Sequence, residues 1–435
     1  MTFAPHTEDE IREMLATIGV GSLDHLFDQI PASVRLGRAL AMPDEISEME
    51  LVADLRDHAA RNRSMDDLVC FAGAGAYDHY VPSVVWALAS RSEFYTAYTP
   101  YQPELSQGVL QVLFEYQSMI AELTDLEVAN ASLYDGPTAL VEAVHMTLAA
   151  PRRRVLVADS LDPRYAELLE TFGRGAGYAP EPFHRVPTMG EDVAAVVVQH
   201  PDVHGELAPV AEVFAAAHAG GAKAVQVFDP LSLGVLAPPG QLGADIAVGE
   251  GQSLGNHLNY GGPYLGIIAT HLADVRRMPG RIVGETLDVD GKPGYVLTLQ
   301  AREQHIRRDK ANSNICTNQT LMAIAATIYL GWLGPEGLRE LGVQCASKAA
   351  YAAERLAALP GVSLLHPDAT FFKEFALRLP RRAADVVSAL LGHGYLGGVP
   401  LERSGEDVLL VAVTEKRSRQ EIDGFVAAMG EVLAS

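Results

Sequence analysis

Between about residues 151 and 270, short runs of β-branched and other apolar residues alternate with helical patterns. The runs are RVLVA at 154–158, AAVVVQ at 194–199, AVQVF at 224–228, DIAVG at 245–249 and GPYLGIIA at 262–269, with helices expected at about 163–173 and 209–219. Continuous apolar strands that alternate with helices indicate a mainly parallel sheet with both faces covered. The chain is therefore expected to have an α/β fold. Sites in such sheets lie beyond the carboxyl ends of the strands, and Asp229 follows AVQVF there.

Helices are expected on both sides of this central pattern. Thr7 and Glu10 form a capping box for a first helix, and further helices are predicted at about 46–61, 82–91, 315–331 and 335–358. The tail alternates strand-like and helical stretches, and Ser418 with Glu421 caps a last helix. We thus expect three parts: an N-terminal helical arm over 1–90, a large domain over 91–310, and helices with a small α+β domain over 311–435.

Composition excludes several classes of protein. A formal net charge of −22 over 435 residues argues against nucleic acid or an anionic membrane as the main partner. Three scattered cysteines predict free thiols in a reducing compartment. The acidic start lacks the features of a secretory signal, and the apolar run Leu321–Gly334 is too short to span a bilayer. A cytoplasmic location is expected.

Two further patterns are weak. Gly73 and Gly75 begin a Gly-x-Gly, but the full six-residue dinucleotide fingerprint is lacking. His200 and His204 have the spacing of metal ligands, yet Pro201 and Gly205 indicate a loop without an evident third ligand. No metal site is predicted.

The stretch 94–138 combines a tyrosine-rich segment with a glycine turn. Tyr98 and Tyr101 lie between prolines, which favours an extended segment that presents its side chains. Ser106 is expected to cap the following helix. A short strand then leads to the turn Gly136–Thr138 at the start of another helix, and such a helix N-terminus can receive a phosphate.

Four motifs together resemble one family. They are YTPYQPELSQG at 98–108, FAGAGAYDHYVPSVV at 71–85, GEGQSLGNHLNYGGPYLG at 249–266 and LTLQAREQHIRRDKANSNICTNQTL at 297–321. These motifs are similar to those of the glycine cleavage system P-protein, the pyridoxal-phosphate glycine decarboxylase. Length and motifs resemble the smaller partner of its two-subunit form, subunit 1 or the alpha subunit. The resemblance covers nearly the whole chain.

The resemblance implies a fold and an activity. The fold is the aspartate aminotransferase-like fold type I of pyridoxal-phosphate enzymes. The complex, a glycine dehydrogenase (aminomethyl-transferring) and hence an oxidoreductase, decarboxylates glycine on pyridoxal phosphate and transfers the aminomethyl group to the lipoyl arm of the H-protein. The implied partners are subunit 2, in a heterodimer doubled to a heterotetramer, the lipoylated H-protein and glycine.

Such a fold needs a Schiff-base lysine, a carboxylate on the pyridine nitrogen and backbone donors for the phosphate. The resemblance places Asp229 as the carboxylate and Asp135, Gly136 and Thr138 at the phosphate turn. Counting back from the Gly-Gly-Pro turn puts Gln252 at the lysine position, and a glutamine amide cannot form an imine. We therefore expect no covalent cofactor on this chain and a lysine on the partner subunit.

Two alternatives remain open at this level. The chain could be a self-sufficient enzyme that uses another lysine; the candidates are Lys223, Lys292, Lys310, Lys348, Lys373 and Lys416. It could also be a purely structural scaffold. If it contributes to the partner's site, the resemblance favours Tyr98, Tyr101, Gln102 and Glu104, which either line the glycine and lipoyl pocket or fill the subunit interface.

Overall fold

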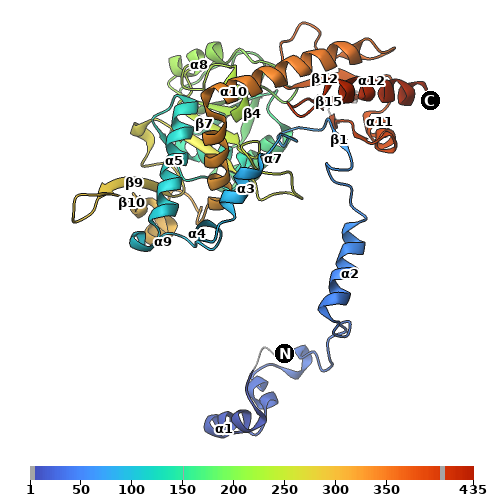
Figure 1. The fold of residues 1–435 in the computed structure, drawn as a ribbon. Coiled ribbons are helices and arrows are strands. Elements are labelled where there is room, and N and C mark those ends of the chain that lie inside the picture. Colours follow the sequence, from blue (N-terminus) through green and yellow to red (C-terminus); the bar gives the residue numbers. More distant parts are fainter. Residues whose placement is uncertain (1–4, 150, 402–406) are drawn as a thin grey trace. The chain divides into compact units, whose positions relative to one another are not determined.

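The computed structural model describes residues 5–149, 151–401 and 407–435, in two compact units, Met1–Asn62 and Arg63–Ser435. Figure 1 shows the elements of each unit. The domain boundaries expected near residues 90 and 310 stay a prediction.

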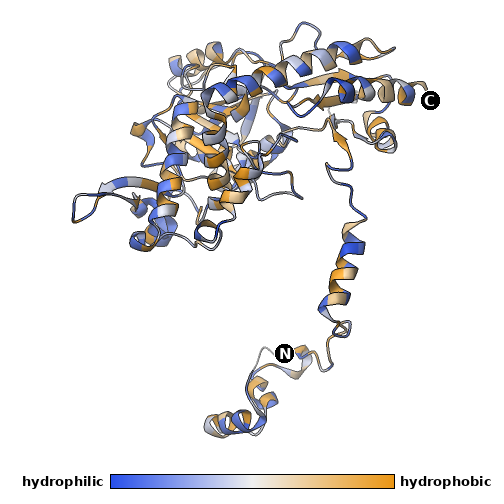
Figure 2. Ribbon diagram, in the orientation of Figure 1, coloured by the Kyte–Doolittle hydropathy of each residue, from blue (hydrophilic) through white to orange (hydrophobic). Residues whose placement is uncertain are grey.

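The first unit consists of short helices that bury none of their residues. They are α1 (Glu8–Ile18), η1 (Leu23–Phe27), η2 (Ala32–Val34) and α2 (Glu48–Ala59). The Thr7–Glu10 capping box predicted from sequence is present, and Ser47 forms a second one with Glu50. Large apolar side chains on these helices are exposed, for instance Phe27 at 53% and Met49 at 79%, and Figure 2 shows hydrophobic stretches along both α-helices.

A seven-stranded sheet forms the centre of the second unit. In spatial order its strands are β2 (Val128–Ala129), β8 (Gly266–Thr270), β7 (Ile246–Glu250), β6 (Lys223–Phe228), β5 (Val193–His200), β3 (Arg154–Ala158) and β4 (Pro180–Phe183). The strands from β7 to β4 pair in parallel, whereas β8 is antiparallel to both of its neighbours. The predicted mainly parallel sheet is confirmed.

Helices cover both faces because successive strand residues point to opposite sides. Val197 and Val225 pack with α6 (Gly136–Thr147) and α7 (Pro163–Ala176), while Val196 and Ala224 pack with α8 (Val210–Ala219). The α8 face continues into a cluster with α3 (Ser83–Ala89), α5 (Gln107–Thr124) and α10 (Thr320–Ala357). Ser106 occupies the N-cap of α5 without a side-chain capping bond, so the capping role predicted for it is wrong.

Helix α10 contains the predicted break but begins later than expected. Gly334 has non-helical torsions (φ 59°, ψ 179°) and Pro335 follows, which separates two helical halves at the expected place. The expected start at 315 is wrong because Asn318 is buried and bonds to Arg281 and to the Ala131 carbonyl. By length and composition α10 could cross a membrane, but it lies in the core of this unit.

The C-terminal part is a small α+β layer. Its antiparallel sheet has the order β11 (Ser363–Leu364), β12 (Glu374–Arg378), β15 (Val408–Ala412) and β14 (Val399–Leu401). Helices α11 (Ala383–Leu390) and α12 (Arg419–Ala434) pack on it, and the Ser418–Glu421 capping box is present. Strand β1 (Val69–Cys70) pairs with β13 (Tyr395–Leu396), so the segment after Asn62 begins on this layer.

A hairpin and several single turns complete the unit. The hairpin joins β9 (Ile282–Leu287) to β10 (Pro293–Thr298) through the predicted Asp290-Gly291 turn. The short helices are α4 (Ser92–Tyr95), η3 (Pro103–Leu105), η4 (Pro230–Gly234), η5 (Leu272–Asp274), η6 (Gln300–Arg302), α9 (Gln304–Arg307), η7 (Arg308–Lys310) and η8 (Leu391–His393).

Candidate active site

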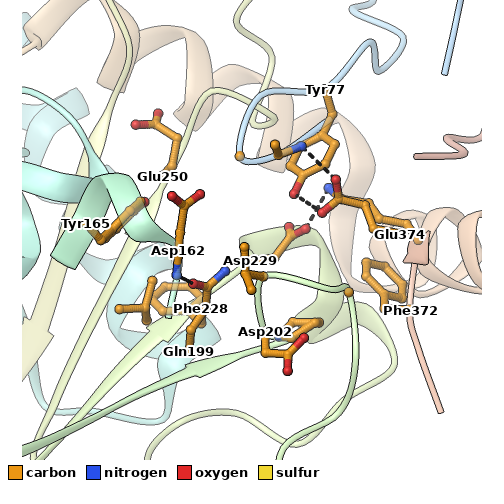
Figure 3. Close-up of a pocket in the computed structure, with 17 residues that line it drawn as sticks. Tyr77, Asp162, Tyr165, Gln199, Asp202, Phe228, Asp229, Glu250, Phe372 and Glu374 are labelled. Carbon is orange, nitrogen blue, oxygen red and sulfur yellow. Dashed lines mark hydrogen bonds and ion pairs between the residues drawn. The ribbon is translucent and has the colours of Figure 1, made fainter. Parts of the chain in front are cut away.

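A small pocket lies at the carboxyl ends of β5, β6 and β7, where an open parallel sheet places its sites. Its volume is about 50 Å³. Figure 3 shows Asp229 near its centre, with Tyr77 and Glu374 on one side and Glu250 and Tyr165 on the other. Pockets for small organic ligands have volumes of about 300–1,000 Å³, whereas one water takes up about 30 Å³ of liquid. This pocket is therefore well below the usual size of a site for a small organic ligand.

Asp229 lies at the predicted strand end and is paired within the chain. One carboxylate oxygen accepts the backbone N–H of Leu231 at 3.0 Å, which starts η4. The other lies 2.6 Å from the Nζ of Lys373, whose side chain is 2% exposed. Lys373 precedes β12, so a residue of the small layer neutralises a carboxylate at the end of the central sheet.

Lys373 is held from two further sides. Its Nζ lies 3.1 Å from Nε2 of His79 and 3.5 Å from the centre of the Tyr77 ring, a cation–π distance. Burial and the neighbouring Lys373 lower the pKa of His79. A neutral His79 can accept from Lys373 at Nε2 and donate from Nδ1 to Glu415, 2.6 Å away. Burial opposes the charge of Glu415, but the bond from His79 brings its pKa down to about 2.

A metal ion would not suit this cluster. His79, Cys345 and Glu415 bring ligand-type atoms within 4.8 Å of one another. The Lys373 ammonium beside His79 would repel a cation, and His79 is already bonded to Glu415.

Gln252, at the position predicted for the lost lysine, is a buried structural residue. Its amide oxygen accepts the N–H of Tyr77 at 2.8 Å, and its amide nitrogen donates to the carbonyls of Tyr77 at 3.2 Å and Asn256 at 2.8 Å. Glu374 holds the same segment through the Tyr77 hydroxyl at 2.6 Å and the Ala74 N–H at 2.7 Å. Burial raises the pKa of Glu374. These contacts fix the loop 71–80 against the pocket.

The predicted glycine turn does begin a helix, and carboxylates of the chain itself bind its backbone donors. Asp135 caps α6 by accepting the Thr138 N–H at 2.8 Å. Glu250, which ends β7, accepts the Gly136 N–H at 2.9 Å with one oxygen. Its other oxygen accepts the N–H groups of Gln252 at 2.9 Å and Leu265 at 3.0 Å. Burial raises the pKa of Glu250 to about 7.

Sequence reasoning missed both Glu250 and the position of Lys373 in the pocket. The only sequence signal for Glu250 is that it ends a predicted strand, where site residues gather. Among the described residues, Lys373 is the lysine that lines this pocket. Lys223, by contrast, begins β6 at the opposite end of the sheet and pairs with Asp245 and Asp274. Lys416 pairs with Asp78 at 2.6 Å.

The tyrosine-rich segment lies elsewhere on the surface. Tyr98 is 85% exposed and Tyr101 is 49% exposed, the latter against His305 and 5.9 Å from the Arg281 guanidinium. Gln102 occupies the N-cap position of η3 without a side-chain capping bond, and Glu104 lies within η3. All four predicted interface residues are outside the set of described residues that line the pocket. Their contribution to a site stays a prediction.

These contacts show that the pocket does not fit pyridoxal phosphate. Gln252 offers no imine nitrogen, Asp229 is paired with Lys373, and the α6 turn is bonded to Glu250. A phosphate dianion would also meet the carboxylates of Asp135 and Glu250. We therefore derive no catalytic step through a cofactor in this chain.

Comparisons with known proteins identify the family. The family model described as "Glycine cleavage system P-protein" matches residues 1–429. The chain is 52% identical to a probable glycine dehydrogenase (decarboxylating) subunit 1 of Moorella thermoacetica, over 100% of both chains, and 50% identical to that of Chlorobium limicola, over 99% of both. A crystal structure of glycine decarboxylase (P-protein) in inhibitor-bound form matches with a TM-score of 0.92 and 47% identity over 100% of both chains. Aspartate aminotransferase of Thermus thermophilus matches with a TM-score of 0.58 at 19% identity, over 84% of this chain and 99% of the other.

The last match confirms the predicted aspartate aminotransferase-like fold. The family match and the full-length relatives confirm the resemblance found in the sequence. This chain belongs to the glycine cleavage system P-protein family.

Proposed function

We propose that this chain is the cofactor-free subunit of a two-subunit glycine decarboxylase. The names of its relatives, probable glycine dehydrogenase (decarboxylating) subunit 1, support a second subunit and this activity. The observation that carries the proposal is Gln252, buried and bonded at the position where the resemblance places the lysine. The partner subunit then supplies the lysine and holds pyridoxal phosphate. The complex decarboxylates glycine and passes the aminomethyl group to the lipoyl arm of the H-protein in the cytoplasm.

The exposed apolar side chains of the first unit support a protein partner. Helices α1 and α2 bury none of their residues within the first unit, and the apolar side chains of Ile18 and Leu55 are 59% and 56% exposed. Exposed apolar faces of this kind mark protein–protein interfaces. We infer that the second subunit covers them in a heterodimer, which doubles to a heterotetramer.

The contribution to catalysis comes from the exposed tyrosine-rich segment. Tyr98 and Tyr101 are rigid rings with polar tips, suited to line a pocket for a small carboxylate and a lipoyl arm. Their exposure here leaves them available to the partner's site. Gln102 and Glu104 lie on the same segment.

An absorption spectrum tests which of the two subunits forms the imine with pyridoxal phosphate. The purified full chain is mixed with pyridoxal phosphate, reduced with borohydride and searched for a modified lysine by mass spectrometry. We expect no imine band from this chain alone, and a band with glycine decarboxylation once subunit 2 is added. A specifically modified lysine in this chain, Lys373 above all, would overturn the proposal in favour of a self-sufficient enzyme.

A further inference from the structure

The pocket contains a buried cation at one end. Asp229 is the carboxylate that the fold would place against the protonated ring nitrogen of a cofactor. In this chain it lies 2.6 Å from the ammonium of Lys373, and both groups are largely shielded from water, with side chains 14% and 2% exposed. His79 accepts a second bond from the same ammonium at 3.1 Å. The positive charge next to Asp229 is therefore that of Lys373, a side chain of the same protein.

The other end of the pocket contains a carboxylate at the helix N-terminus. The α6 turn presents N–H groups and the positive end of a helix dipole, an arrangement that favours an anion. Glu250 accepts the Gly136 N–H there, together with those of Gln252 and Leu265. A Cβ on Gly136 would lie 2.3 Å from the Tyr165 hydroxyl and 3.1 Å from Glu250, so the turn and this side chain fit closely.

We propose that Lys373 and Glu250 replace the two charged ends of pyridoxal phosphate with side chains of the chain itself: the ammonium for the ring nitrogen and the carboxylate for the phosphate. Both residues line the same small cavity at the carboxyl ends of the sheet strands. The inference rests on the proposed function, since it assumes a chain without cofactor. It goes further by assigning two latent ion sites, a cation site at Asp229 and an anion site at the α6 turn.

Removal of either side chain should leave an ion site that a small ion of the same charge can fill. Lys373→Ala leaves the Asp229 carboxylate without its cation. Glu250→Ala leaves the N–H groups of Gly136, Gln252 and Leu265 without their acceptor. Loss of one partner of a buried ion pair is strongly destabilising, and so is loss of the acceptor for three buried N–H groups. We therefore expect a fall in melting temperature of about 5 °C for each variant in a unit of this size.

The experiment is a crossed rescue of the full-length variants by small ions. Melting temperature is measured against increasing ethylammonium chloride or inorganic phosphate at constant ionic strength. Ethylammonium should restore most of the loss in Lys373→Ala in a saturable manner and do nothing for Glu250→Ala, while phosphate should do the reverse. Where a variant does not fold unaided, the fraction refolded in each ion gives the same crossed pattern.

A matched control is Lys416→Ala, which removes a lysine at the same 2.6 Å distance from an aspartate. Asp78 keeps Arg417 at 3.1 Å, so this variant should not respond to ethylammonium. Rescue that is missing, unsaturable or independent of the sign of the ion would overturn the inference. Binding of pyridoxal phosphate by the unaltered chain would instead overturn the proposed function, so the two failures are distinguishable.

Discussion

Replacement of Gln252 by leucine tests whether the position where the resemblance places the lysine has a structural role in this chain. Leucine has a similar volume but forms none of the three side-chain hydrogen bonds that join Gln252 to Tyr77 and Asn256. The Tyr77 carbonyl keeps a bond from the His79 N–H at 3.0 Å. The Tyr77 N–H and the Asn256 carbonyl lose the Gln252 side chain as their hydrogen-bond partner. Gln252 is only 1% exposed, so this loss occurs inside the protein.

An orphaned buried polar group costs about 1–3 kcal/mol, so two of them destabilise the fold by about 3 kcal/mol. The entropy of unfolding of the unit Arg63–Ser435 is about 0.8 kcal/mol per kelvin by size scaling. We therefore expect Gln252→Leu to lower the melting temperature by about 4 °C in differential scanning calorimetry of the full chain.

The control is Gln111→Leu, which removes an exposed glutamine whose amide donates to Glu115 within helix α5. That pair contributes about 0.3 kcal/mol, so the melting temperature should change by less than about 1 °C. The reasoning is refuted if Gln252→Leu melts within about 1 °C of the unaltered chain, because the buried bonds would then carry no net stability.

Two further predictions concern Glu250 and Tyr98. The pKa of Glu250 is raised from 4.5 to about 7 by burial, so the folded state binds a proton that the unfolded state has lost and stability falls as pH rises through this range. Between pH 5 and pH 8, the free energy of unfolding should therefore fall by about 2–3 kcal/mol less in Glu250→Gln than in the unaltered chain, as measured by urea titration. The same fall in both proteins would contradict this. Tyr98→Ala should lower carbon dioxide release from carboxyl-labelled glycine roughly tenfold in an intact complex with subunit 2, with Tyr95→Ala, 67% exposed in the adjacent helix, as control. Full turnover in Tyr98→Ala would favour the scaffold alternative.

Local patterns predicted most of the elements but not the pocket. RVLVA was predicted as a strand to the residue, because a continuous apolar run bounded by polar residues specifies a buried strand without long-range information. The start of α10 was misplaced because the bond of the buried Asn318 to Arg281 holds the segment just before Thr320 outside the helix. Asp229 and the α6 turn could be placed from strand and helix ends.

The residues that pair with Asp229 and with the α6 turn could not be placed from local sequence. Lys373 reaches Asp229 from a different layer of the fold, and Glu250 reaches Gly136 across 114 residues of sequence. The sequence around Lys373 is partly apolar, with Phe372 before it and Phe375 after it, but this pattern does not specify which carboxylate the lysine meets. Such pairs depend on how the layers pack, which periodicity does not specify.

The pairing of Asp229 with Lys373, and of the α6 turn with Glu250, also affects how such a chain can evolve. With a lysine at position 252, Asp229 would still be paired with Lys373 and the α6 turn would still be bonded to Glu250. Removal of either residue first would leave a buried charge or unpaired donors, and the intermediate would be selected against through its lower stability. On the proposed function, a gain of cofactor binding by this chain would therefore need several coordinated mutations, and the chain would stay dependent on its partner for catalysis.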